Sequence, residues 1–226
     1  MKKFWSVITL CLVLIAAWGQ ESEVRSVGSF TGIKAAEAID VYLKKGDKES
    51  VKVEASGTDL SNVLTEVSGS YLKIHMRDGR YRNRNVKVYV TYVSVNKIHV
   101  STAANIFSDE TIKARSMDIS AASAGSAELS IDAESVSVDA SSAGDVVLEG
   151  KTKSIEIEVA TAGEIDAYGL ESESGHASAS SGGSAKISVS KELTAHASSG
   201  GSIKYRGSPA KTNTSSSSGG SVKKSN

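Results

Sequence analysis

Four carboxylates in the middle of the chain recur at a spacing that could bring them together in pairs. Asp139 and Glu158 are 19 residues apart, and so are Asp145 and Glu164. If the chain repeats with that period, each pair occupies equivalent positions on neighbouring strands, about 4.8 Å apart. Such pairs could share a calcium ion, or serve as the acid and base of a polysaccharide lyase or hydrolase. The simpler interpretation is a solvated acidic face.

A cluster of arginines lies between two segments that alternate like strands. It contains Arg77, Arg80, Tyr81, Arg82 and Arg84, and the same stretch holds an Asp-Gly pair and two asparagines, which predict an exposed hairpin loop. Guanidinium groups bind phosphate, sulfate or uronate through forked hydrogen bonds. The loop is therefore a candidate binding site for an acidic glycan or an envelope lipid, with a plain solvated hairpin as the alternative.

Other residues with catalytic or metal-binding potential are arranged less favourably. His176 and His196 stand at different distances from the repeated glycine that follows each of them, so they are not expected in register for zinc. In the coils that carry the repeated glycine motif, from residue 117 on, only Tyr168 and Tyr205 are aromatic, whereas a carbohydrate groove would need more aromatic side chains. We predict no catalytic residues, no metal site and no cofactor, with calcium at the carboxylate pairs as the alternative.

These spacings follow from a three-residue motif that returns six times in the second half of the chain. The motif reads Ser-Ala-Gly, Thr-Ala-Gly or Ser-Gly-Gly. Apolar residues alternate before each motif, as in Ile155, Ile157 and Val159, and a second short alternation follows it. There is no leucine ladder. The sequence therefore predicts an all-β fold, a right-handed parallel β-helix with coils of roughly 19 residues and a glycine at each corner. The corner glycines are Gly125, Gly144, Gly163, Gly183, Gly201 and Gly220.

The serine or threonine two residues before each corner glycine is predicted to point inward. Residues two apart on a strand share a face, so counting on from Ile119 and Ala121 puts Ser123 inside the coil. Its counterparts would then form an internal column of hydroxyl groups. A row of hydroxyls exposed to a ligand is the alternative. The counterparts are Ser142, Thr161, Ser181, Ser199 and Ser218.

The chain is predicted to be exported as a single domain. Residues 1–19 combine Lys2 and Lys3, an apolar stretch and a small-x-small ending, which indicate a signal peptide; Cys11 lacks the context of a lipidation site. The β-helix is expected over 20–207, with wider, less regular coils at 24–100 and regular coils at 101–207. Residues 208–226 are expected to form a polar terminal coil or a flexible tail. A separate antiparallel cap over roughly 24–92 is the alternative to wider coils.

Charge is balanced overall but segregated along the chain. There are 26 basic and 26 acidic residues, with an acidic middle and a basic end. Three positions after the corner glycine, Glu128 and Asp166 give way to Lys186 and later lysines. This pattern favours binding to an anionic surface or head-to-tail self-association, or is simply a solvated surface. No stretch after the signal peptide is apolar enough to cross a bilayer, and an exported protein is not expected to bind nucleic acid.

Several segments resemble one family of secreted bacterial proteins, described as “Putative auto-transporter adhesin, head GIN domain”. The similar residues are Phe30-Thr31-Gly32-Ile33, Ile39-Asp40-Val41, Val51-Lys52-Val53-Glu54, Leu72-Lys73-Ile74 and the corner Ser142-Ala143-Gly144-Asp145-Val146. The resemblance implies a right-handed parallel β-helix similar to pectin lyases, an adhesive role and no established catalytic residues. Where that family has Gly-Ile-Asn or Gly-Ser-Asn, this chain has glycine followed by serine, aspartate or glutamate.

Together these features predict a non-catalytic protein of the cell envelope. We expect an adhesin or surface-recognition module, in the periplasm, on the outer surface or outside the cell, that binds an anionic glycan or another surface ligand. A polysaccharide lyase or hydrolase and a passive envelope scaffold are the alternatives.

Overall fold

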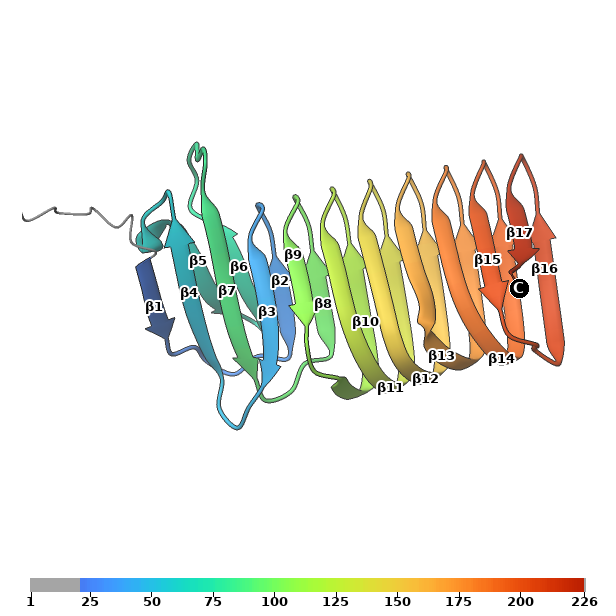
Figure 1. Ribbon diagram of the computed structural model, residues 1–226, viewed down its shortest axis with the longest axis horizontal. Coiled ribbons are helices and arrows are strands. Elements are labelled where there is room, and N and C mark those ends of the chain that lie inside the picture. Colours follow the sequence, from blue (N-terminus) through green and yellow to red (C-terminus); the bar gives the residue numbers. More distant parts are fainter. Residues whose placement is uncertain (1–20, 226) are drawn as a thin grey trace, which may run out of the picture.

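A computed structural model describes residues 21–225 and shows an all-β solenoid of about seven turns with roughly 19-residue spacing (Figure 1). This confirms the predicted β-helix. The predicted signal peptide, residues 1–19, lies outside the described residues. Each regular strand ends at a corner turn, and all but the first also begin just after one and bend on the way to the next. These strands are β10 (Ile112–Ala121), β11 (Ser126–Ala140), β12 (Asp145–Val159), β13 (Glu164–Ala179) and β14 (Ser184–Ala197).

Parallel pairing at the repeat period stacks like residues into buried columns. Ile119, Val138, Ile157, Ala177 and Ala195 form one such column, and all are almost completely buried. The change from isoleucine to alanine removes three carbons, or about 2 kcal/mol of burial at roughly 0.8 kcal/mol for each methylene. The interior is therefore less strongly stabilised toward the carboxyl end.

The first coils do not stack in the order of the sequence. The coil made by β2 and β3 lies between the coil of β6 and β7 and the coil of β8 and β9, with parallel pairing on both sides. In the described residues, antiparallel pairs occur only at this end. Strand β4 pairs with β7 on one side and with β1 on the other, and β5 pairs with β6. The strands are β1 (Glu21–Arg25), β2 (Gly32–Ala35), β3 (Asp40–Lys45), β4 (Ser50–Ser56), β5 (Val63–Ser68), β6 (Tyr71–Met76), β7 (Asn85–Tyr92), β8 (Lys97–Val100) and β9 (Asn105–Ser108).

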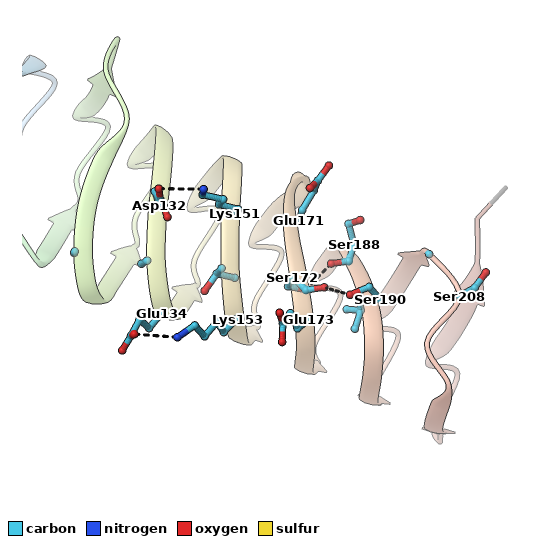
Figure 2. Close-up of a pocket in the computed structure, with 15 residues that line it drawn as sticks. Asp132, Glu134, Lys151, Lys153, Glu171, Ser172, Glu173, Ser188, Ser190 and Ser208 are labelled. Carbon is cyan, nitrogen blue, oxygen red and sulfur yellow. Dashed lines mark hydrogen bonds and ion pairs between the residues drawn. The ribbon is translucent and has the colours of Figure 1, made fainter.

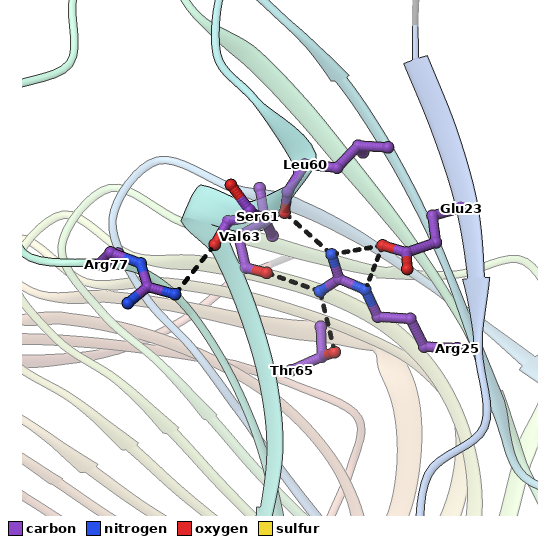
Figure 3. A network of polar contacts seen from close by, with 7 residues as sticks. All are labelled: Glu23, Arg25, Leu60, Ser61, Val63, Thr65 and Arg77. Carbon is purple, nitrogen blue, oxygen red and sulfur yellow. Dashed lines mark hydrogen bonds and ion pairs between the residues drawn. The ribbon is translucent and has the colours of Figure 1, made fainter.

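Arg25 ties the amino-terminal strands together (Figure 3). Its guanidinium donates to the carbonyl oxygens of Val63 at 2.6 Å and Leu60 at 2.9 Å, and to the hydroxyl of Thr65 at 3.2 Å. Glu23 pairs with it at 2.8 Å. Leu60 belongs to a short 3₁₀ turn, Leu60–Asn62, that precedes β5. One partly buried side chain thus satisfies backbone acceptors at the end of the sheet.

The last copy of the repeat continues the stack with a polar interior. Strand β14 pairs with β15 (Ser202–Arg206) and β16 (Lys211–Ser216), and β15 pairs with β17 (Ser221–Lys224). Thr212 and Thr214 stand where the preceding coil has Leu193 and Ala195. All of β16 is exposed. Hydrogen bonding between strands, rather than apolar burial, holds this copy to the solenoid.

The corner turns overturn the prediction that their hydroxyl groups point inward. Ser123 and Ala124 have left-handed backbone angles, with φ of 50° and 60°, and the side chain of Ser123 is exposed. The same holds for Ser142, Thr161, Ser181, Ser199 and Ser218. The inward prediction was wrong because the extended strand, along which side chains alternate, ends at Ala121, and the left-handed turn begins at Ser123. Glu37-Ala38 and Thr102-Ala103 form two further turns of this kind.

Candidate ligand-binding surface

The corner turns line up along one edge of the solenoid, at the top of Figure 1, and we call this row the turn edge. Backbone hydrogen bonds run from turn to turn, as from the amide of Ala124 to the carbonyl of Ser142 at 3.1 Å and from Ala143 to Thr161 at 3.2 Å. The exposed hydroxyls therefore stand in a regular file, held by a continuous backbone ladder. Its members are Thr102, Ser123, Ser142, Thr161, Ser181, Ser199 and Ser218.

The arginine loop, residues 77–84 between β6 and β7, projects at the amino-terminal end of the same edge (Figure 1). Two of its arginines support the loop. Arg84 donates to the carbonyl oxygen of Glu37 and lies over the ring of Tyr81, 5.4 Å from its centroid. Arg77 donates to the carbonyl oxygen of Ser61 at 3.4 Å (Figure 3). These contacts fix both ends of the loop against neighbouring turns.

The other two arginines are exposed and uncommitted. Within residues 21–225, neither Arg80 nor Arg82 has a hydrogen bond or an ion pair. Both line a hollow of about 510 Å³ together with Tyr81, Glu37 and Thr102. Two unpaired guanidinium groups beside a shallow hollow can take up an anionic group through charge-assisted hydrogen bonds. Two carboxylates, on Glu37 and Asp78, also line the hollow, and that of Glu37 accepts a hydrogen bond from the amide of Met76 at 2.7 Å.

The carboxylate pairs lie in register on neighbouring coils, Asp139 beside Glu158 and Asp145 beside Glu164. Burial raises the pKa of Asp139 above its usual range, and the charge of Glu158 adds to that rise. Burial likewise raises the pKa of Asp145, followed by the charge of Glu164. Among the described residues, no three His, Cys, Asp or Glu side chains converge on a point that could hold a metal ion.

Lys186 occupies the space beside the second pair. Its ammonium group lies 3.3 Å from Glu164 and 2.8 Å from Asp166, and it partly offsets the rise in the pKa of Asp145. The histidines are out of register, because His176 pairs with Thr194 and His196 with Ser178. The next coil places Ser178 beside Glu158 and Ser184 beside Glu164, so it adds no histidine to either carboxylate pair.

A second hollow, the corner groove, lies where the long strands bend (Figure 2). It measures about 850 Å³ and opens where β13 and β14 lose register between Ala167 and Glu171. Its charges are largely paired, as in Lys153 with Glu134 at 3.0 Å and Lys151 with Asp132 at 3.5 Å. No pattern in the sequence predicts this groove, because a register break depends on how two coils of different length meet.

A row of aromatic side chains was also missed. Tyr42 stacks between Tyr89 and Phe107, with ring centroids 5.2 Å and 5.3 Å apart. The three residues come from β3, β7 and β9, which are distant in the sequence. The sequence holds one sign of this row, which is a shared spacing. Tyr42 and Phe107 each lie four residues after the second residue of a corner turn, Ala38 or Ala103.

The chain matches one family model over most of its length. The family described as “Putative auto-transporter adhesin, head GIN domain” matches residues 29–209. No curated protein matches the chain. Within the described residues, no helix is long and apolar enough to cross a membrane.

Solved structures share the fold at low sequence identity. A crystal structure of a “putative adhesin” from Bacteroides fragilis has a TM-score of 0.82 at 19% identity, covering 92% of this chain and 97% of that one. A “putative adhesin” from Parabacteroides merdae has a TM-score of 0.74 at 15% identity, covering 92% and 96%. A “Putative lipid binding protein” from Parabacteroides distasonis has a TM-score of 0.72 at 19% identity, covering 92% and 97%. At these identities the likeness establishes the solenoid.

Proposed function

The chain belongs to the family described as “Putative auto-transporter adhesin, head GIN domain”. On that premise we propose that it is an exported, non-catalytic surface-recognition module that binds an acidic glycan along its turn edge. One observation carries the proposal. Arg80 and Arg82 are exposed and unpaired within the described residues, in a loop that other contacts hold in place. An adhesin needs such a prepared site, because ordering a loose loop on binding lowers affinity.

The chemistry of this site selects for anionic groups. Arginine forms paired hydrogen bonds to uronate, sulfate or phosphate oxygens, and it stays charged at any physiological pH. The hydroxyl file continues from the loop along the edge and can donate to or accept from further sugar hydroxyls. A long, rigid edge with one charged anchor suits a chain-like ligand better than a small molecule.

The proposal is tested by affinity gel electrophoresis in gels that contain polygalacturonate. The wild-type protein should be retarded, and the Arg80→Ala/Arg82→Ala variant should bind at least about tenfold more weakly. A hydrogen bond to a charged group contributes about 1.5–3 kcal/mol, and about 1.4 kcal/mol is tenfold in affinity. The matched control is Lys204→Ala/Lys223→Ala, which removes two positive charges from the face that follows the turns. Binding should weaken with added salt.

The outcomes separate the alternatives. Equal loss in both double variants would show that net charge alone is responsible and would overturn the site. Preferential binding to vesicles containing phosphatidylglycerol would assign the loop to lipid headgroups instead of a glycan. New chain ends in the polygalacturonate would show catalysis, and Asp139 with Glu158 would then be the first residues to replace, since the pKa of Asp139 is raised.

Exposure on the cell is a separate requirement of an adhesive role. Protease treatment of intact cells should remove the protein while a periplasmic marker and an intracellular marker survive. Protection of the protein together with the periplasmic marker would contradict adhesion and favour a role inside the envelope.

A further inference from the structure

A single row of side chains crosses the sheet formed by the strands that follow the turns. In register along it are Lys52, Tyr89, Tyr42, Phe107 and Glu128, on five neighbouring strands. We call Tyr89, Tyr42 and Phe107 the aromatic row. Alternation along each strand turns these three rings to the outer face, away from the buried core.

The rings are held against one another but remain accessible. Neighbouring ring planes are inclined by only 20° and 25°, so the rings stack in an offset manner. Tyr89 is 37% exposed, and Tyr42 and Phe107 are partly exposed. The ammonium group of Lys52 lies 5.6 Å from the centroid of Tyr89 at one end of the row. The stack is therefore a rigid apolar strip on an open surface.

Polar side chains border the strip on both sides. Two residues before the rings, and on the same face, lie Lys87, Asp40 and Asn105; the amide of Asn105 donates to Asp40 at 2.7 Å. Two residues after the rings lie Thr91 and Lys44. An apolar centre with hydrogen-bonding borders repeats the pattern of a sugar ring, which presents C–H groups on its faces and hydroxyls at its edge.

We propose that the aromatic row is a carbohydrate-stacking platform, on which consecutive sugar rings of a glycan lie along the solenoid axis. The sugar faces rest on the aromatic rings, and the sugar hydroxyls reach the polar borders. The site is distinct from the arginine loop, and the inference stands or falls independently of it.

A glycan fits this strip better than a protein partner does. A stable protein interface buries about 800 Å² on each partner, whereas the apolar strip is one file of three rings. A chain-like ligand needs only a narrow track. Strand β7 also begins directly after the arginine loop, so Tyr89 lies five residues, or about 16 Å of extended chain, beyond Arg84. The aromatic row therefore lies near the arginine loop but is separated from it along the strand, so a glycan that lies along the solenoid axis contacts the row without needing the loop.

The test uses affinity gels containing either neutral hydroxyethylcellulose or polygalacturonate. Tyr89→Ala and Phe107→Ala should each weaken retardation in at least one polymer by roughly tenfold, the loss typical of truncating a central contact side chain. Tyr89→Phe keeps the ring and should bind almost normally. Val147→Ala is the matched control, because Val147 is 39% exposed in the same row, beyond Glu128. Circular dichroism checks that each variant folds.

A second measurement requires no variant. Nitration of Tyr89 by tetranitromethane, quantified by mass spectrometry, should slow when the binding polymer is present, while nitration of Tyr205 should not change. Absence of retardation of the wild-type protein in both gels would overturn the inference. Full retention by Tyr89→Ala and Phe107→Ala would overturn it as well. Loss of binding only in the Arg80→Ala/Arg82→Ala variant would leave the arginine loop as the glycan site and refute the platform.

Discussion

Replacing Gly144 by alanine should destabilise the solenoid strongly, because the corner glycine touches the backbone of the coil before it. A methyl group at Gly144 would lie 2.2 Å from the carbonyl oxygen of Ala121 and 2.5 Å from its carbonyl carbon. These are backbone atoms, which cannot rotate away. The oxygen also accepts a hydrogen bond from the amide of Ser141 at 3.0 Å. Overpacking costs about 1–3 kcal/mol and one hydrogen bond about 1 kcal/mol, so we expect a loss of about 3 kcal/mol.

The neighbouring turn offers a matched control in Gly182→Ala. Gly182 has a positive φ of 75°, but nothing lies within 4 Å of a methyl group placed there. Ala124, Ala143 and Ala162 already occupy the equivalent position in other turns with φ of 58° to 60°. The substitution should therefore cost at most about 1 kcal/mol, the strain of a left-handed residue.

Thermal unfolding followed by circular dichroism measures the difference. For a chain of this size, about 3 kcal/mol corresponds to a fall in Tm of roughly 6–12 °C. Since solenoids can unfold in parts, hydrogen exchange of amides in β11 and β12 should show the loss locally. If Gly144→Ala and Gly182→Ala unfold at the same temperature, close packing between coils is not the reason for the corner glycine.

Three further changes test the electrostatics and the amino-terminal end. Asp139→Asn should stabilise the protein at neutral pH, because burial and the charge of Glu158 raise the pKa of Asp139 in the folded state. The native chain gains stability as the pH falls through that raised pKa, so the advantage of the variant should shrink in acid. An advantage that does not change with pH in unfolding experiments would contradict this. Lys186→Met should lower stability by at most about 1 kcal/mol, because its ion pairs with Glu164 and Asp166 are partly exposed. Loss of its positive charge should also raise the pKa of Asp145 further, as measured by NMR titration, and an unchanged pKa would be inconsistent with this network. Arg25→Ala should leave the carbonyl oxygens of Leu60 and Val63 without their donor and lower stability by about 1–3 kcal/mol. Hydrogen exchange should become faster in β5 but not in β13, and an equal change in both strands would argue against a local role.

The period of the repeat determined more than the fold class. In a parallel solenoid each coil lies one repeat from the next, so a spacing of 19 residues places Asp139 beside Glu158 without further information. The direction of Ser123 could not be derived in this way. Counting by twos holds only while the backbone stays extended, and the left-handed turn begins two residues after Ala121.

The sequence by itself thus determined the repeat, the β-solenoid and the in-register placement of the carboxylate pairs, because these follow from local periodicity. Only the tertiary structure decided that the coil of β2 and β3 lies between two coils that come later in the chain, and therefore that Tyr42 meets Tyr89 and Phe107. It also divided the arginine loop into supporting and free residues, through contacts with Glu37 and Ser61. Both depend on pairing between segments distant in sequence, which no local pattern encodes.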